Sequence, residues 1–312
     1  MFGVCLGAAV LAAGCGGQGA GPGSTQAANR CAGAQLSCAQ LVELGLTYPY
    51  RRERGSYLFV NGVAFPYVRV TRQLLGDSLV SAAGDVMTAA ALIRLLHAPQ
   101  RRGPLTPVLA YGANPNVDAL TRKYLSPSDP MSAVIPVIKG RLADYDVTWT
   151  PQLVVNGAMP STLTPSPGTE ISIWTTWLAS AELRRLNATE GVGTQYSVGR
   201  LRGARVRFPG PPVHDPLVYV DCRGPLRVGD QTLAVAAVPA QRRRFVPLSS
   251  AAALDRVAPT LHWRESALSL IVDNVRHPSA RQARDQRLAA LAAPVLDPHY
   301  RPSAGCGDGA GG

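Results

Sequence analysis

Short apolar segments separated by turn residues run through most of the chain and predict alternating strands and helices. Residues 170–178 combine β-branched and aromatic side chains, which is typical of a buried strand. Residues 57–65 are two apolar segments around Asn61-Gly62, the strongest short-range signal for a β-hairpin. In residues 87–97 the apolar side chains recur at helical spacing, so we expect a helix that ends near His97. The pattern therefore predicts an α+β protein.

Residues 108–116 hold the pattern on which the functional interpretation depends. Residues 108–110 predict a buried strand that arrives at a turn, and residues 117–124 predict a short helix. Between them, Gly112 can take backbone angles closed to other residues, and Asn114 tolerates the left-handed region. Such a turn leaves several backbone N–H groups unpaired and pointing one way, which suits a carboxylate or an oxyanion. Most glycine turns of this kind only redirect the chain, so further residues have to support a binding role.

The segments after this turn continue the mixed pattern. We expect a strand over 133–138 that turns at Gly140, a tight hairpin over 158–164, and a helix that starts at Ser180 and ends near Glu190. Glu182 lies in the first turn of that helix, where the helix dipole favours an acid. Further strands are expected over 195–206 and 224–240, helices over 249–257 and 280–293, and either a helix or a strand over 266–275.

The composition changes this picture little. The 312 residues are 46% hydrophobic, which is ample for a core, and the formal net charge of +11 favours an acidic partner or an anionic membrane surface. Lysine occurs only at positions 123 and 139, however, and the arginines are spread along the chain. No basic helix or aromatic–basic interleaving stands out, so we expect no nucleic-acid partner.

Residues 1–15 are short, apolar and uncharged, which is typical of a secretory signal and too short for a membrane span. Residues 12–15, Ala-Ala-Gly-Cys, resemble a bacterial lipobox, and this resemblance implies that Cys15 becomes the lipidated first residue. Residues 16–39 predict a flexible tether. We therefore expect a protein exported to the cell envelope and anchored to the membrane by lipid. A disordered cytosolic leader is the alternative, because the segment lacks a basic n-region.

Export leaves four further cysteines, namely Cys31, Cys38, Cys222 and Cys306. In an oxidising compartment they permit three disulfide pairings, among which the sequence does not choose. If Cys31 and Cys38 lay in one helix, they would be about 10 Å apart, too far for a bridge. No CxxC occurs and the histidines lie far apart, so we predict no metal site.

Four segments, in this order, resemble the γ-glutamylcyclotransferase family. They are residues 110–114, residues 140–144, residues 167–168 before a strand, and residues 183–192 followed by Tyr196. The family has a tyrosine-glycine-serine-asparagine loop and a later glutamate-glycine-valine segment at similar separation. The resemblance covers about residues 106–225. It departs from the family at Ala113, which stands where the family usually has serine.

This resemblance implies a fold and a site. The fold would be a small mixed, partly closed β-barrel-like sheet with surrounding helices, and the ligand would lie at its open end. Tyr111, Gly112, Ala113 and Asn114 would bind the α-carboxylate of a γ-glutamyl group, with Glu190 as the general acid/base. Tyr219 is a candidate substrate contact, although a tyrosine on a strand is commonly part of the core. Neither a metal nor an organic cofactor is required.

The implied chemistry needs these residue types. The α-amine of a γ-glutamyl amine or peptide attacks its own γ-carbonyl, closes the ring of 5-oxoproline and releases the amine. A carboxylate has to take a proton from the α-ammonium and pass one to the leaving amine, while free backbone amides stabilise the oxyanion. Holding the substrate in the ring-closing conformation removes several kcal/mol of barrier. Glu182 is the nearest rival carboxylate, but its position in the first turn already explains it.

We expect residues 40–105 to form an N-terminal hairpin-plus-helix unit and residues 106–275 to form the cyclotransferase-like core. Residues 276–312 would supply a C-terminal helix and a disordered tail. Two other functions remain open. In the first, the chain is a non-catalytic envelope lipoprotein that binds a small amino-acid-like ligand, and Ala113 marks lost activity. In the second, it is an envelope scaffold whose pocket is vestigial.

Overall fold

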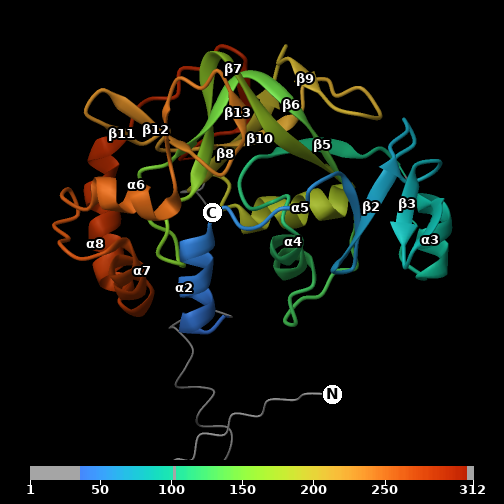
Figure 1. Cartoon of the computed structure of the whole chain (residues 1–312), viewed down its shortest axis with the longest axis horizontal. Coiled ribbons are helices and arrows are strands. Elements are labelled where there is room, and N and C mark those ends of the chain that lie inside the picture. Colours follow the sequence, from blue (N-terminus) through green and yellow to red (C-terminus); the bar gives the residue numbers. More distant parts are fainter. Residues whose placement is uncertain (1–35, 101–102, 308–312) are drawn as a thin grey trace, which may run out of the picture.

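The computed structural model describes residues 36–100 and 103–307 (Figure 1). The expected signal peptide, the lipidation candidate Cys15 and tether residues 16–35 lie outside the described residues. Seven α-helices are described: α2 (Cys38–Thr47), α3 (Ala89–Leu95), α4 (Val117–Tyr124), α5 (Ser180–Thr189), α6 (Ser250–Val257), α7 (Ala267–Arg276) and α8 (Pro278–Leu288). A single 3₁₀ turn, η1 (Ala289–Leu291), follows the last of them. None of these helices has both the length and the apolar character that a bilayer crossing requires.

The strands form one open, mostly antiparallel sheet. They are β1 (Tyr57–Val60), β2 (Val63–Arg69), β3 (Leu79–Ala82), β4 (Asp85–Thr88), β5 (Thr106–Ala110), β6 (Val134–Trp149), β7 (Ser161–Leu178), β8 (Tyr196–Leu201), β9 (Val206–Arg207), β10 (Leu217–Asp221), β11 (Arg227–Val228), β12 (Gln231–Val235), β13 (Ala240–Gln241), β14 (Val246–Leu248) and β15 (Tyr300–Ala304). The main path runs β15-β8-β10-β5-β7-β6-β1-β2-β3-β4, and only β10–β5 and β12–β14 pair in parallel. The α+β class is confirmed. The two ends of the path do not pair within the described chain, so the expected barrel-like closure is absent.

The turn expected at Gly140 and the tight hairpin expected over 158–164 are wrong. Gly140 lies inside β6 and residues 161–164 lie inside β7, and these two strands pair along most of their length with one irregularity between Ala143 and Tyr145. At Gly140 the missing side chain makes room for another strand, because a Cβ there would lie 2.4 Å from the Arg207 carbonyl oxygen and 2.2 Å from the Phe208 ring. Glycine therefore serves close packing here, and the long pairing overrides the local turn residues.

The hairpin at Asn61-Gly62 is confirmed. Both residues have positive φ, +46° and +93°, as a two-residue type I′ turn requires. The strand β1 also pairs with β6, so this N-terminal hairpin is continuous with the main sheet. The helix expected from residue 87 starts later, because β4 extends through Thr88, whose side chain caps α3.

The C-terminal part is more ordered than its composition predicts. Residues 266–275, left open as helix or strand, are helical, with Ser266 capping α7. Beyond α8, where we expected a disordered tail, β15 pairs with β8, and Cys306 forms a disulfide with Cys222. The structure thus selects one of the cysteine pairs that the sequence left open, and Cys38 is disulfide-bonded as well.

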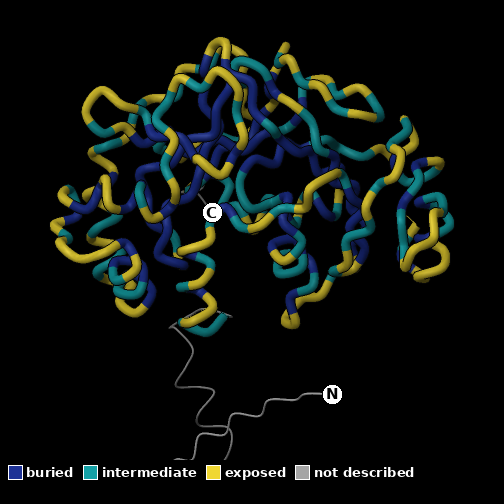
Figure 2. Tube along the Cα trace, viewed as in Figure 1, coloured by how far each residue is buried: buried dark blue, intermediate teal, exposed yellow. Residues whose placement is uncertain are grey.

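Apart from α3, which packs against β3 and β4, the described helices cover the sheet in two groups, and each group shares a core with it. In Figure 1, α4 and α5 lie beneath the central strands, whereas α6, α7 and α8 lie together with α2 on one side. The first group packs Leu120, Tyr124 and Leu186 against the sheet. The second group contributes to the largest cluster, which includes the fully buried Trp149. Figure 2 shows that the buried residues are concentrated in the central strands, whereas the exposed residues lie mainly in the outer loops.

Candidate functional site

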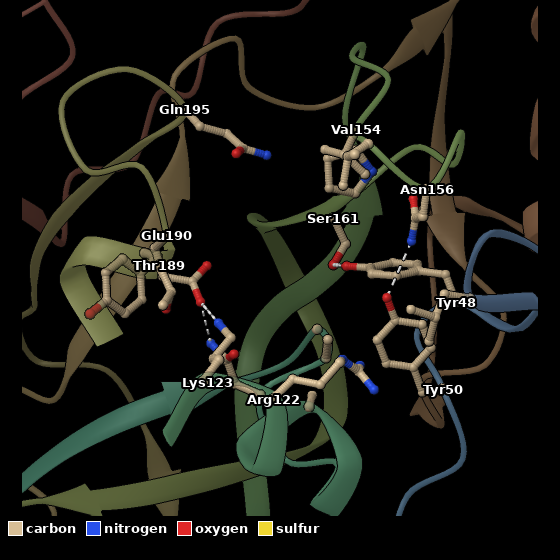
Figure 3. Close-up of a pocket in the computed structure, with 18 of the residues that line it drawn as sticks. Tyr48, Tyr50, Arg122, Lys123, Val154, Asn156, Ser161, Thr189, Glu190 and Gln195 are labelled. Carbon is tan, nitrogen blue, oxygen red and sulfur yellow. Dashed lines mark hydrogen bonds and ion pairs between the residues drawn. The ribbon is translucent and has the colours of Figure 1, made fainter. Parts of the chain in front are cut away.

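A cavity of about 350 Å³ lies where the two cores meet, and the predicted site residues converge on it. Its wall includes the loop 111–114, Glu190 and Tyr219, all of which the sequence singled out. The remaining wall comes from α2, residues 48–50, α4, residues 154–161 and the start of β8 (Figure 3). Segments that are far apart in the sequence therefore enclose one small space, in which polar and aromatic side chains stand among aliphatic ones.

Helix ends position the two predicted motifs. At the end of β5, the loop leads into α4, whose first turn is capped by Asn116: the Asn116 Oδ1 accepts the Ala119 N–H at 2.9 Å. Glu190 is the C-cap of α5, where its N–H donates to the Leu186 carbonyl at 3.0 Å. Gly191 follows with φ of +59°, a conformation that favours glycine and ends the helix.

Glu190 and Asn114 are in direct contact. The Asn114 side-chain amide donates to Glu190 Oε1 at 3.2 Å, and the Lys123 ammonium forms an ion pair with the same oxygen. The side chains of Lys123 and Glu190 are only 18% and 13% exposed, so solvent screens this pair weakly. Figure 3 shows Glu190 and Lys123 facing each other on one side of the cavity. The Glu190 carboxylate is therefore charge-compensated by Lys123.

Glu182, the rival carboxylate, has a structural role. It is fully buried at the start of α5, where it accepts the Ala179 N–H at 2.7 Å and the Val134 N–H at 3.3 Å. These bonds tie the first turn of α5 to β6, and the residue does not line the cavity. Among the described carboxylates, Glu190 is the one in the cavity wall.

The loop 111–114 offers free amides, but for a different reason than the sequence indicates. Gly112 does not have a positive φ; instead, a Cβ there would lie 3.0 Å from the Tyr48 hydroxyl and 3.2 Å from Ser161 Oγ. Glycine thus permits close approach of two side chains. Within the described chain, the N–H groups of residues 112–114 donate to no protein acceptor. On the other side, one guanidinium nitrogen of Arg52 donates to the carbonyls of Tyr111 and Gly112.

The tyrosines of the wall are committed to other protein groups. Tyr111 donates its hydroxyl to the Tyr219 carbonyl, and Tyr219 donates its own to Asn187 Oδ1 at 2.5 Å. Burial raises the pKa of both phenols well above the ordinary value, so they remain neutral donors. The predicted substrate contact Tyr219 therefore lines the cavity while its hydroxyl holds α5 against β10.

The opposite wall contains residues that sequence reasoning missed. Tyr48 and Ser161 share a hydrogen bond of 2.7 Å between their hydroxyls, and Asn156 donates to the Tyr50 hydroxyl at 3.2 Å. The Arg122 guanidinium lies 5.5 Å from the centre of the Tyr50 ring. Lys123 was missed too, although its rarity was a signal, since the chain has only one other lysine. The other residues gave no signal, because their contacts join segments about 70 or more positions apart.

This arrangement suits a small zwitterion. One carboxylate can face an ammonium, the cations of α4 and the loop amides can face a carboxylate, and aliphatic and aromatic side chains line most of the remaining space. No group of three or more His, Cys, Asp or Glu in residues 36–100 and 103–307 is placed to hold a metal ion.

No family model matches the chain, and no curated protein matches it either. A solved structure described as "Gamma-glutamyl cyclotransferase" is similar with a TM-score of 0.31 and 13% sequence identity. The alignment covers 62% of this chain and 90% of that one.

Proposed function

We propose that the chain is a γ-glutamylcyclotransferase-type enzyme that releases 5-oxoproline from a γ-glutamyl amine or peptide, with Glu190 as general acid/base. The observation that supports it is the hydrogen bond between Asn114 and Glu190, which joins two motifs 76 positions apart at one cavity. In the proposal, the loop 111–114 holds the α-carboxylate of the γ-glutamyl group. In this proposal Glu190 moves the protons and the loop amides contact the oxyanion, so the chemistry needs no metal or cofactor.

In this mechanism Glu190 moves the protons of the reaction. The substrate α-ammonium takes the place of Lys123 beside the Glu190 carboxylate and loses a proton to it. The amine nitrogen then bonds to the γ-carbon, and backbone amides of the loop stabilise the oxyanion. Collapse of this tetrahedral intermediate breaks the bond between the γ-carbon and the leaving nitrogen. Overall, two protons pass from the α-nitrogen to the leaving nitrogen, which departs as an ammonium, and Glu190 returns to its carboxylate form.

Replacement of Glu190 by glutamine tests the proposal. The purified protein is incubated with γ-glutamyl dipeptides and γ-glutamyl amines, and the 5-oxoproline that it releases is measured. We expect Glu190→Gln to lower kcat/KM by about 10²–10⁴-fold, the usual contribution of general acid–base catalysis. Glu265→Gln, the same change at an exposed position outside the cavity, is the control and keeps wild-type activity. Wild-type rates in Glu190→Gln would contradict the mechanism.

The second candidate is a non-catalytic module that binds an amino-acid-like ligand in the same cavity. The Lys123–Glu190 pair favours it, because a matched ammonium and carboxylate can each exchange for one charge of a zwitterion. Ala113 also lacks the hydroxyl usual in the related loops. Binding of L-glutamate or 5-oxo-L-proline without turnover in the same assay would support this candidate.

We also propose that the chain is exported and lipid-anchored through Cys15, as the lipobox-like segment predicts. Detergent partitioning of the full chain after expression in a bacterial host tests this, since Cys15→Ser would then release the protein into the aqueous phase.

A further inference from the structure

Arg52 is a half-buried cation behind the loop 111–114. Its Nη2 donates to the Gly112 carbonyl at 3.0 Å and to the Tyr111 carbonyl, and its guanidinium lies 5.0 Å from the centre of the Trp174 ring. Its Nε and Nη1 are buried and have no hydrogen-bond partner in the described structure. No carboxylate among residues 36–100 and 103–307 forms an ion pair with it.

Burying the Nε and Nη1 atoms of a cation without an anionic partner is costly, so this position needs a reason. Burial lowers the pKa of Arg52 to about 10, which still leaves the guanidinium protonated at neutral pH. The carbonyl oxygens and the Trp174 face compensate part of the charge. The remaining positive potential of the guanidinium acts on groups at the far side of the two peptide groups to which it donates.

The two hydrogen bonds fix the direction of those peptide groups. In an extended chain successive carbonyls point to opposite sides, but here the carbonyls of Tyr111 and Gly112 reach one nitrogen. A trans peptide group carries its N–H opposite its C=O. The N–H groups of Gly112 and Ala113 therefore both point away from Arg52. They belong to residues of the cavity wall, and neither has a protein acceptor in the described structure.

We propose that Arg52 is a positioning residue that aims and polarises the amides of Gly112 and Ala113 as an anion site. Hydrogen bonds in a chain polarise one another, so a cation on the carbonyls strengthens the N–H donors on the far side. The site takes a carboxylate or an oxyanion from a ligand in the cavity. This inference rests on the proposed function only for its kinetic test, since anion binding can be measured without turnover.

The structure offers a matched control at Lys139. Its Nζ lies 5.1 Å from the centre of the same Trp174 ring, but it donates to the Arg54 carbonyl at 3.0 Å and not to the loop. Lys139→Met therefore removes a nearby positive charge without touching the carbonyls of Tyr111 and Gly112. Arg52→Met removes both the charge and the two bonds, and Arg52→Lys keeps the charge alone.

We expect Arg52→Met to lower kcat/KM for a γ-glutamyl dipeptide by about ten- to a hundredfold, somewhat less than the loss of a direct oxyanion donor. A rise in KM identifies the α-carboxylate of the substrate as the anion that the amides hold, whereas a fall in kcat at constant KM identifies the oxyanion that develops during the reaction. Arg52→Lys should be intermediate, and Lys139→Met should stay within about twofold of wild type. Circular dichroism and Tm verify folding, and Arg52→Lys carries the test if Arg52→Met does not fold.

Other outcomes separate this inference from the proposed function. A kcat/KM within twofold of wild type in Arg52→Met, or an equal loss in Lys139→Met, overturns the role of Arg52 while the enzyme assignment stands. If the wild type forms no 5-oxoproline, its affinity for 5-oxo-L-proline is measured by calorimetry. A tenfold or greater loss of affinity in Arg52→Met then supports the anion site. Unchanged affinity, or no binding by the wild type, overturns it.

Discussion

Removal of the Tyr219 hydroxyl tests whether this residue of the cavity wall contacts the substrate through that group. Because it donates to Asn187, we expect Tyr219→Phe to keep kcat/KM within about threefold of wild type and to lower the free energy of unfolding by about 1 kcal/mol. Urea denaturation and the 5-oxoproline assay measure the two effects. Tyr300→Phe, which removes a hydrogen bond to Ser197 outside the cavity, is the control for stability. A large loss of activity with unchanged stability would instead place the hydroxyl on the substrate.

Asp221 gives the protein a pH-dependent stability. It is 3% exposed, and burial raises the pKa of its carboxyl to about 7, although the Arg223 N–H and the Gln152 amide hydrogen-bond to it. The folded state thus binds this proton more tightly than the unfolded state, whose value is 3.8. The stabilisation is complete below pH 4 and is lost as the pH rises towards 7.

We therefore expect Asp221→Asn to be less sensitive to pH than wild type. Between pH 5 and pH 8 the wild type loses free energy of unfolding relative to this variant, as measured by urea denaturation at several pH values. The exposed substitution Asp230→Asn should follow the wild-type profile. Parallel profiles for wild type and Asp221→Asn would show that Asp221 titrates normally.

At the residue scale, the sequence predicts the site only where its residues form contiguous motifs. The loop 111–114 and Glu190 each lie within a recognisable segment, and the structure brings them to one cavity. Arg52 is outside any motif, because its role depends on two carbonyls about sixty positions away. The pairing of Lys123 with Glu190 could not be predicted either, since the two residues are 67 positions apart along the chain.

At the element scale, the pairing of β6 with β9 depends on the absence of a side chain at Gly140. We expect Gly140→Val to lower the free energy of unfolding by about 2–4 kcal/mol, because the new side chain meets the Arg207 backbone and the Phe208 ring. Thermal or urea unfolding measures this. Gly55→Ala, where a Cβ meets nothing within 4 Å, is the control. Equal stability of both variants would refute the close-packing role of Gly140.

Elements whose ends are marked by local residues, such as a helix cap or a tight turn, were predicted well. Asn116 caps α4, whose bounds are those the sequence predicts, and the Asn61-Gly62 turn forms the expected hairpin. The long hairpin of β6 and β7 was missed, because glycines and prolines that favour turns in isolation are overridden by continuous pairing across the sheet. Local chemistry determines where a helix starts, whereas partners determine how far a strand extends.

At the scale of the whole molecule, the Cys222–Cys306 disulfide and β15 fasten the C-terminal part to the sheet. The bridge closes a loop of 84 residues. We expect the double variant Cys222→Ser/Cys306→Ser to lose about 2–4 kcal/mol of unfolding free energy under oxidising conditions. Cys38→Ser, which disrupts a different disulfide, is the comparison. If the double variant is as stable as wild type, the bridge does not constrain the fold.

The sequence by itself determined the α+β class, the hairpin, most of the helices and two motifs of the cavity. These properties depend on spacing and capping within short segments. Only the tertiary structure decided the open sheet, the long β6–β7 pairing and the cysteine pair Cys222–Cys306. It also decided which charges meet at the cavity. Each of these depends on contacts between residues that are far apart in the chain, and no local pattern records where a distant partner will lie.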